Sequence, residues 1–196
     1  MSNRRVTLER STRETEIRLE LDLDGRRQLD VRTGLGFLDH MITALAFHAG
    51  WDLRLGCRGD LEVDDHHTVE DCALVLGEAI DRGLGERQGI ARFGWAYAPL
   101  DEALARVVVD LSGRAASQVD LGLERQQIGD VASENLVHFF QSLAQQMRAA
   151  LHVDVLRGAN DHHRAEAAFK ATALALKSAL AVVDEVGTPS TKGVLV

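Results

Sequence analysis

The stretch Asp65-His66-His67-Thr68-Val69-Glu70 occurs a second time in the chain, as Asp161-His162-His163-Arg164-Ala165-Glu166. If each copy begins a helix, the first histidine and the glutamate are i,i+4 neighbours, and the second histidine and the glutamate are i,i+3 neighbours. The glutamate can therefore share an ion with either imidazole. Adjacent histidines on a helix diverge by about 100°, so they rarely ligate one metal ion together. The pattern favours two ions, with each His-His pair serving both.

A third histidine joins each copy when the repeat is extended upstream. The segment 37–46 aligns with the segment 135–144 and matches His40 to His138. The chain then holds two equivalent sets, each with three imidazoles and one carboxylate, which suit Mn, Fe, Co, Ni or Zn. The absence of a thiolate from these sets argues against a structural zinc site. The predicted metal ligands are His40, His66, His67, Glu70, His138, His162, His163 and Glu166.

The composition limits the classes of protein that need to be considered. A chain of 196 residues with 45% hydrophobic content fits one globular domain or two small ones. Its formal charge of −8 argues against a nucleic-acid partner, because such proteins usually carry a basic surface. We expect no membrane association and a cytoplasmic location, since no stretch has the apolar length of a membrane span and no apolar run follows the first residues. The two cysteines, Cys57 and Cys72, do not suggest a disulfide framework.

Apolar residues alternate with polar ones in segments 17–23 and 29–31, on either side of the turn residues Asp24-Gly25. This pattern predicts a hairpin. The second half repeats it, with segments 107–111 and 115–121 on either side of Ser112-Gly113. The duplication therefore reaches beyond the histidines.

Helical spacing of apolar residues predicts a helix in each half before the repeated motif and another that begins at the motif. A strand at 51–55, with a short partner near Leu61 and Val63, is expected between the first two helices. The second half is expected to have a strand at 151–156 and a last helix from His162 to Val183. Glycines concentrate between residues 83 and 99, so we place the junction there. The predicted repeats are residues 1–92 and 93–196, which together form one catalytic domain.

These patterns predict an α+β fold. Each half is expected to be a mostly antiparallel four-stranded sheet with two helices, and a pseudo-twofold axis relates the halves.

Four ordered motifs, which span nearly the whole chain, resemble the imidazoleglycerol-phosphate dehydratase family of histidine biosynthesis. They are Gly36–Met41, Asp65–Asp71, Asp161–Lys170 and Pro189–Gly193. The resemblance, which is to the monofunctional form, implies a fold like that of ribosomal protein S5 domain 2. It also implies two Mn²⁺ per active site and a homo-oligomer of 24 subunits with octahedral symmetry and active sites at subunit interfaces.

The activity that the resemblance implies is dehydration of D-erythro-imidazoleglycerol phosphate to imidazole acetol phosphate. The proton to be lost lies on a carbon with no neighbouring carbonyl, so simple base catalysis would face a very poor acid. Metal ions on both ring nitrogens favour an imidazolate. The imidazolate can expel the hydroxyl group to give a diazafulvene, from which the C–H proton leaves readily.

The resemblance also assigns residues to the substrate. Glu14 matches a substrate-contacting glutamate and is the best candidate to shuttle protons. Cationic and hydroxyl side chains match the contacts to the phosphate: Arg92, Arg114, Lys170, Ser190, Thr191 and Lys192. The residues expected to take part in catalysis are Glu14, His67, Glu70, His163, Glu166 and Lys170.

Two other readings remain open from the residues alone. One is a metal-dependent phosphoesterase, because the Asp-His-His triplet also occurs in a phosphodiesterase family, although those proteins carry further aspartates that this chain lacks. The other is a non-enzymatic metal-binding cage, which has no need for the predicted phosphate contacts.

Overall fold

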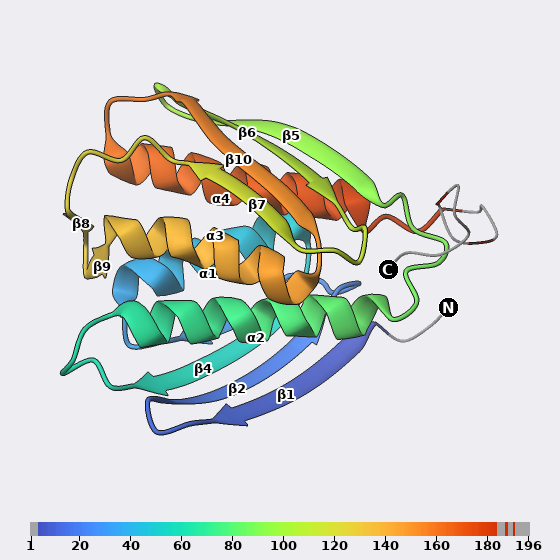
Figure 1. Ribbon diagram of the computed structural model, residues 1–196, viewed down its shortest axis with the longest axis horizontal. Coiled ribbons are helices and arrows are strands. Elements are labelled where there is room, and N and C mark those ends of the chain that lie inside the picture. The colour runs from blue at the N-terminus through green and yellow to red at the C-terminus, as the bar shows by residue number, and fades with distance from the viewer. Residues whose placement is uncertain (1–3, 184–186, 188–189, 191–196) are drawn as a thin grey trace.

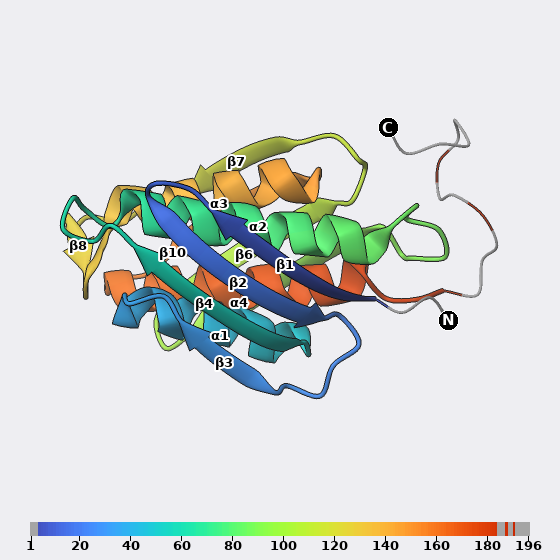
Figure 2. The same ribbon diagram turned by 90° about the horizontal axis from the view of Figure 1, so that it is seen from below.

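The computed structural model describes residues 4–183, 187 and 190, and the first half begins with three strands, which a helix, a fourth strand and a second helix follow. In chain order these are β1 (Arg5–Ser11), β2 (Thr15–Asp22), β3 (Leu29–Arg32), α1 (Gly36–Ala49), β4 (Asp52–Gly59) and α2 (His66–Leu84). The strands form one sheet in the order β1-β2-β4-β3, which Figure 2 shows from its outer side. The β1–β2 and β2–β4 pairs are antiparallel, and the β3–β4 pair is parallel.

The second half repeats this order of elements with one insertion. It comprises β5 (Phe93–Leu100), β6 (Ala103–Asp110), β7 (Ala116–Asp120), β8 (Gln127–Ile128), β9 (Val131–Ala132), α3 (Ser133–Met147), β10 (Ala150–Arg157) and α4 (Asp161–Ala179). The sheet order is β5-β6-β10-β7, with β7 parallel to β10, and the short β8–β9 pair is the insertion. The expected α+β class is therefore confirmed, with two mixed sheets that each have two antiparallel pairs and one parallel pair.

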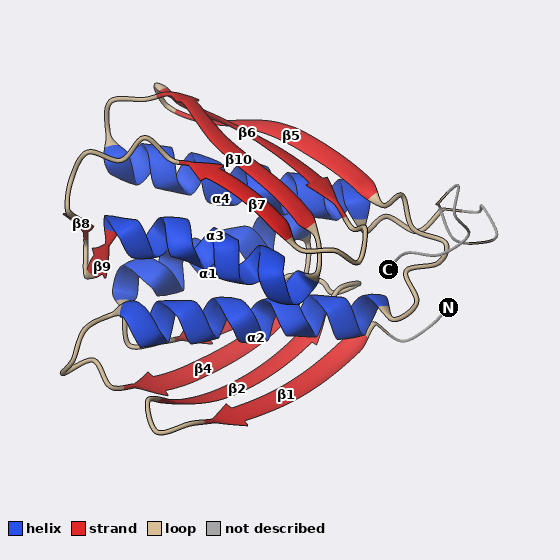
Figure 3. Ribbon diagram, viewed as in Figure 1, coloured by secondary structure: helices blue, strands red, loops and turns tan. Residues whose placement is uncertain are grey.

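The two sheets lie on the outside of the molecule and the four helices lie between them (Figures 1 and 3). Alternation buries one face of each strand, as in β2, where every second residue from Thr15 to Leu21 is buried. The helices pair across the halves: α2 packs on α3, and α1 packs on α4. At Gly77 of α2 a Cβ would lie 2.6 Å from the carbonyl oxygen of Leu143 in α3, so only glycine permits this close approach.

The expected hairpins are wrong, because β4 lies between β2 and β3 and β10 lies between β6 and β7. After Gly25 the chain passes over the start of β4 and pairs with its far edge as β3, so β3 does not form a hairpin with β2. There the carboxylate of Asp52 accepts the backbone N–H groups of Arg26 and Gln28, at 2.6 and 2.8 Å. The hairpin of the first half is formed by β1 and β2, and β5 and β6 form its equivalent.

Three further expectations need correction. Leu61 and Val63 lie in a turn region and form no strand. The glycine-rich junction is shorter than expected, because Gly94 and Pro99 belong to β5. The last helix ends at Ala179 rather than at Val183, because the backbone beyond it pairs with the segment before β5 through Ala91 N–H to Ala181 O and Val183 N–H to Gly89 O, both at 2.9 Å.

Among the described helices, none combines the length and the apolar character that crossing a bilayer requires.

Candidate metal centres

The first group of converging donors is formed by α2 and α3. His66 and Glu70 lie one turn apart on α2, with His66 Nε2 3.7 Å from Glu70 Oε2. His138 of α3 approaches the other carboxylate oxygen, with Nε2 3.2 Å from Glu70 Oε1. The start of α2 is tied to the start of α3, because the Asp65 carboxylate accepts the backbone N–H of Ala132 at 2.8 Å.

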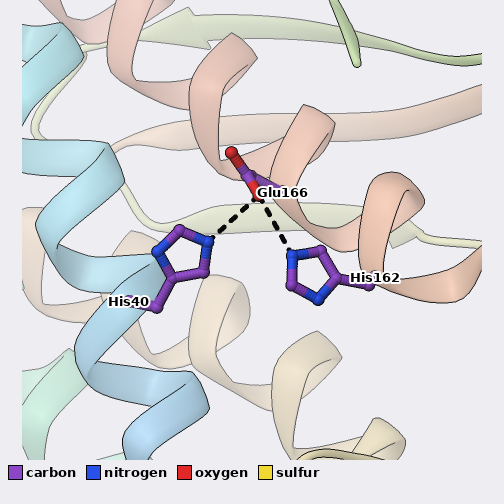
Figure 4. A group of neighbouring side chains, drawn as sticks. All are labelled: His40, His162 and Glu166. Carbon is purple, nitrogen blue, oxygen red and sulfur yellow. Dashed lines mark hydrogen bonds and ion pairs between the residues drawn. The ribbon is translucent and has the colours of Figure 1, made fainter. Parts of the chain in front are cut away.

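The second group is formed by α1 and α4 (Figure 4). His162 and Glu166 lie one turn apart on α4, and His40 comes from α1. Glu166 Oε2 lies 3.1 Å from His40 Nε2 and 3.2 Å from His162 Nε2.

The two groups have the same construction. In each, one half supplies a His and a Glu from the repeated motif, and the other half supplies the third histidine. One ligand atom from each member lies within 4.8 Å of the other two. The pairing of helices across the halves produces this result, and it brings together His40 and Glu166, which are 126 residues apart in sequence.

The electrostatics of Glu166 favour its role as an anionic ligand. Its side chain is 12% exposed, and Lys170 Nζ lies 2.6 Å from Oε1. Burial, the largest single effect, would raise the pKa of this carboxyl, but the hydrogen bonds and the positive charges of Lys170 and His40 together outweigh it and lower the pKa to about 2. Glu166 is therefore ionised at any pH at which the imidazoles are neutral.

His67, the second histidine of the first motif, lies apart from both groups. Its Nδ1 lies 3.1 Å from a carboxylate oxygen of Asp60, and its Nε2 lies 3.7 Å from Glu14 Oε1. The hydrogen bond to Asp60 raises the pKa of His67 above its usual range.

His163 of the second motif also contacts two carboxylates. Its Nδ1 lies 2.8 Å from Glu102 Oε2, and its Nε2 lies 3.8 Å from Asp101 Oδ2. The hydrogen bond to Glu102 raises the pKa of His163. The same bond, with the backbone N–H groups of Asn160 and Ala159, lowers the pKa of Glu102 to about 2.

Of the residues predicted to contact the phosphate, only some lie near the two donor groups. Lys170 reaches it, because it follows Glu166 by one turn of α4. Arg92 lies at the opposite end of α4, where its N–H donates to Ala179 O at 2.9 Å and its guanidinium pairs with Asp110. Ser190 and Arg114 are described and have interactions of their own. Thr191 and Lys192 lie outside the described residues.

The sequence analysis missed the acidic residues around His67 and His163, the two motif histidines that lie outside the donor groups. These are Asp60, Asp101 and Glu102. It also missed Asp71, which is buried and holds the β1–β2 turn onto α2 by an ion pair with Arg10 and by accepting the Thr15 hydroxyl at 2.5 Å. Only Asp71 gave a signal, because it directly follows the motif glutamate.

The fold and the site together define a duplicated α+β protein with two candidate metal centres, each made of imidazole and carboxylate donors. The family model for imidazoleglycerol-phosphate dehydratase matches residues 33–176. The chain is 49% identical to the dehydratase of Eremothecium gossypii, over 97% of each chain. It is 57% identical to that of Phytophthora nicotianae over 98% of its own length, although it spans only 42% of that protein.

A solved structure agrees with these relatives. The crystal structure of the dehydratase from Staphylococcus aureus superposes with a TM-score of 0.83 at 34% identity. The superposed region covers 91% of this chain and 99% of the Staphylococcus aureus chain. The chain belongs to the imidazoleglycerol-phosphate dehydratase family, which consists of metal-dependent hydro-lyases of histidine biosynthesis.

Proposed function

We propose that this chain dehydrates imidazoleglycerol phosphate to imidazole acetol phosphate at a site that holds two Mn²⁺ ions. The observation that carries the proposal is the pair of equivalent donor groups, because an imidazole ring has two nitrogens and two metal centres can engage both. Family membership supplies the substrate and the reaction.

The donor chemistry fits such ions. Each group directs two imidazole nitrogens and one carboxylate oxygen to a common point, and neither includes a thiolate. Bound ions would supply the Lewis acidity that favours deprotonation of the substrate's imidazole ring, from which the diazafulvene route follows.

We infer that His67 and His163 complete the eight-residue ligand set across a subunit interface. In the described part of the chain neither joins a group of its own subunit, and each presents Nε2 to a surface carboxylate. Each group of three donors would then gain a fourth from a neighbouring copy. An assembly of 24 subunits with octahedral symmetry is the form of this proposal that the family resemblance favours.

The positions of the residues predicted to contact the phosphate also support an active site shared between subunits. Glu166 and Ala179, beside which Arg92 lies, are separated by 13 residues of α4, which is about 20 Å at 1.5 Å per residue. Arg92 therefore lies too far along α4 to bind the phosphate of a substrate held at the Glu166 group of its own chain. Arg92, Arg114, Ser190, Thr191 and Lys192 would serve a site formed with another copy, and Lys170 would serve the site beside its own Glu166.

The protons are assigned to this chain's own side chains. Glu14 lies in the β1–β2 turn with Oε1 3.7 Å from His67 Nε2, so a substrate held at His67 would have the carboxylate beside it. Glu14 would accept the C–H proton and return a proton to the product enol. Lys170 is held beside Glu166 by their 2.6 Å contact and can donate to an oxygen of the substrate.

The assay that tests the function measures which product leaves imidazoleglycerol phosphate. We expect the ketone to form without release of inorganic phosphate, and activity to disappear after chelation and return with Mn²⁺. Release of phosphate would indicate a metal-dependent phosphoesterase, and metal binding without turnover would indicate a non-enzymatic metal-binding cage.

A further inference from the structure

His67 and His163 share an arrangement that their sequence surroundings do not explain. A carboxylate contacts Nδ1 of each ring: Asp60 at 3.1 Å on His67, and Glu102 at 2.8 Å on His163. A carboxylate accepts hydrogen bonds and cannot donate them, so Nδ1 of each neutral ring carries the proton. Nε2 is then the nitrogen with a free lone pair, and the carboxylates that face it lie at 3.7 and 3.8 Å, beyond hydrogen-bonding distance.

The two carboxylates come from positions that the duplication does not relate. Asp60 follows β4, whose equivalent in the second half is β10. Glu102 lies in the β5–β6 turn, whose equivalent in the first half is the β1–β2 turn. The shared arrangement was therefore not simply copied with the repeat. It indicates that each half needs its second histidine held in one tautomer and one orientation.

We propose that Asp60 and Glu102 are positioning residues, which hold His67 and His163 as Nδ1-protonated tautomers so that each presents Nε2 to a metal ion. The inference rests on the proposed function, in which both histidines are ligands. A carboxylate behind a ligating imidazole fixes the ring and makes it a better ligand, and its loss typically weakens metal binding by about 10- to 100-fold.

The contacts of Glu102 allow a sharp test with Glu102→Gln. Oε1 accepts the backbone N–H groups of Ala159 and Asn160, at 3.0 and 2.9 Å, and Oε2 contacts His163. A glutamine keeps both backbone bonds by placing its oxygen at the Oε1 position. Its NH₂ group then faces His163 Nδ1 and forces that nitrogen to accept. The proton moves to Nε2, which can no longer bind metal.

For Asp60, the contacts lead us to expect different metal affinities in the asparagine and alanine variants. Its two oxygens lie 3.2 and 3.1 Å from His67 Nδ1, and no other side chain in the described part of the chain hydrogen-bonds to them. Asparagine can therefore turn its oxygen toward Nδ1 and keep the tautomer, whereas alanine cannot. We expect Asp60→Asn to bind metal nearly as the parent does and Asp60→Ala to bind it weakly.

The experiment titrates metal-free parent and variants with Mn²⁺ and measures free Mn²⁺ by electron paramagnetic resonance. Glu102→Gln should weaken one of two sites per chain by about 10-fold or more, and Asp60→Ala should weaken the other. Glu62→Gln is the control, because Glu62 is exposed in the same loop as Asp60 and loses the same charge. Thermal unfolding of each metal-free variant shows whether its fold is kept.

Two results would overturn the inference. One is an affinity within twofold of the parent at both sites of Glu102→Gln. The other is an equal loss in Asp60→Asn and Asp60→Ala, and this pair decides the question even if Glu102→Gln does not fold. A parent that binds no Mn²⁺ is a separate result, which contradicts the proposed function itself.

Discussion

Glu14 is the side chain whose assigned role can be separated most cleanly from metal binding. It lies in the β1–β2 turn and belongs to neither donor group. Glu14→Gln keeps the size of the side chain but removes the base, so we expect Mn²⁺ content to stay at the parental level and turnover to fall by about 10²- to 10⁴-fold. Steady-state kinetics with metal analysis of the same sample checks this. Turnover equal to that of the parent would show that another group moves the proton.

The raised pKa values of His67 and His163 determine how metal binding depends on pH. Asp60 and Glu102 favour the protonated rings, whereas metal binding needs neutral ones, so protons compete with the ion. We expect Mn²⁺ affinity to fall as the pH drops, starting above the ordinary histidine value of about 6.5. Glu166, with a pKa of about 2, stays ionised throughout. Titrations at pH 8, 7 and 6 test this, and constant affinity over that range would contradict it.

At the level of residues, the sequence predicted the converging donor side chains because duplication reveals them. His40, His138 and the repeated motifs align between the halves, and six of the eight predicted ligands lie in the two groups. The orienting carboxylates could not be found in this way. Asp60 precedes its histidine by 7 residues and Glu102 precedes its histidine by 61, so no common spacing links them.

At the level of elements, alternation predicted most strands but not their neighbours. It indicated β2 and β3 correctly as strands, yet it could not show that β4 lies between them, because a strand inserted later in the chain leaves no local trace. The first strand of each half, β1 and β5, was not predicted. Gly94 and Pro99 within β5 are typical of turns and hid the second of these.

Close packing of α4 on β5 explains why the strand has a glycine, Gly94, in place of a residue with a side chain. A Cβ there would lie 2.0 Å from the carbonyl oxygen of Ala175 in α4, so the helix lies directly on the strand. We expect Gly94→Ala to lower the free energy of unfolding by about 1–3 kcal/mol or more. Gly56→Ala in β4 is the control, because its Cβ would meet no atom within 4 Å. Denaturant unfolding of both variants tests this, and equal midpoints would contradict the close packing.

At the level of the whole molecule, the pairing of helices across the halves creates the two donor groups. Neither half contains a complete group, because α2 needs α3 and α4 needs α1. If His67 and His163 reach another copy, metal also links subunits. We therefore expect chelation to lower the native mass of the assembly and Mn²⁺ to restore it. Native mass spectrometry before and after chelation measures this, and an unchanged mass would show that the interface forms without metal.

The two-metal site is tested most directly by anomalous diffraction from crystals of the Mn²⁺-loaded protein, recorded on both sides of the manganese absorption edge. We expect two manganese peaks per chain, one at His40, His162 and Glu166 and one at His66, Glu70 and His138, each completed by His67 or His163 of another copy. A single peak per chain, or peaks away from both groups, would contradict the claim that the duplicated halves build a two-metal site.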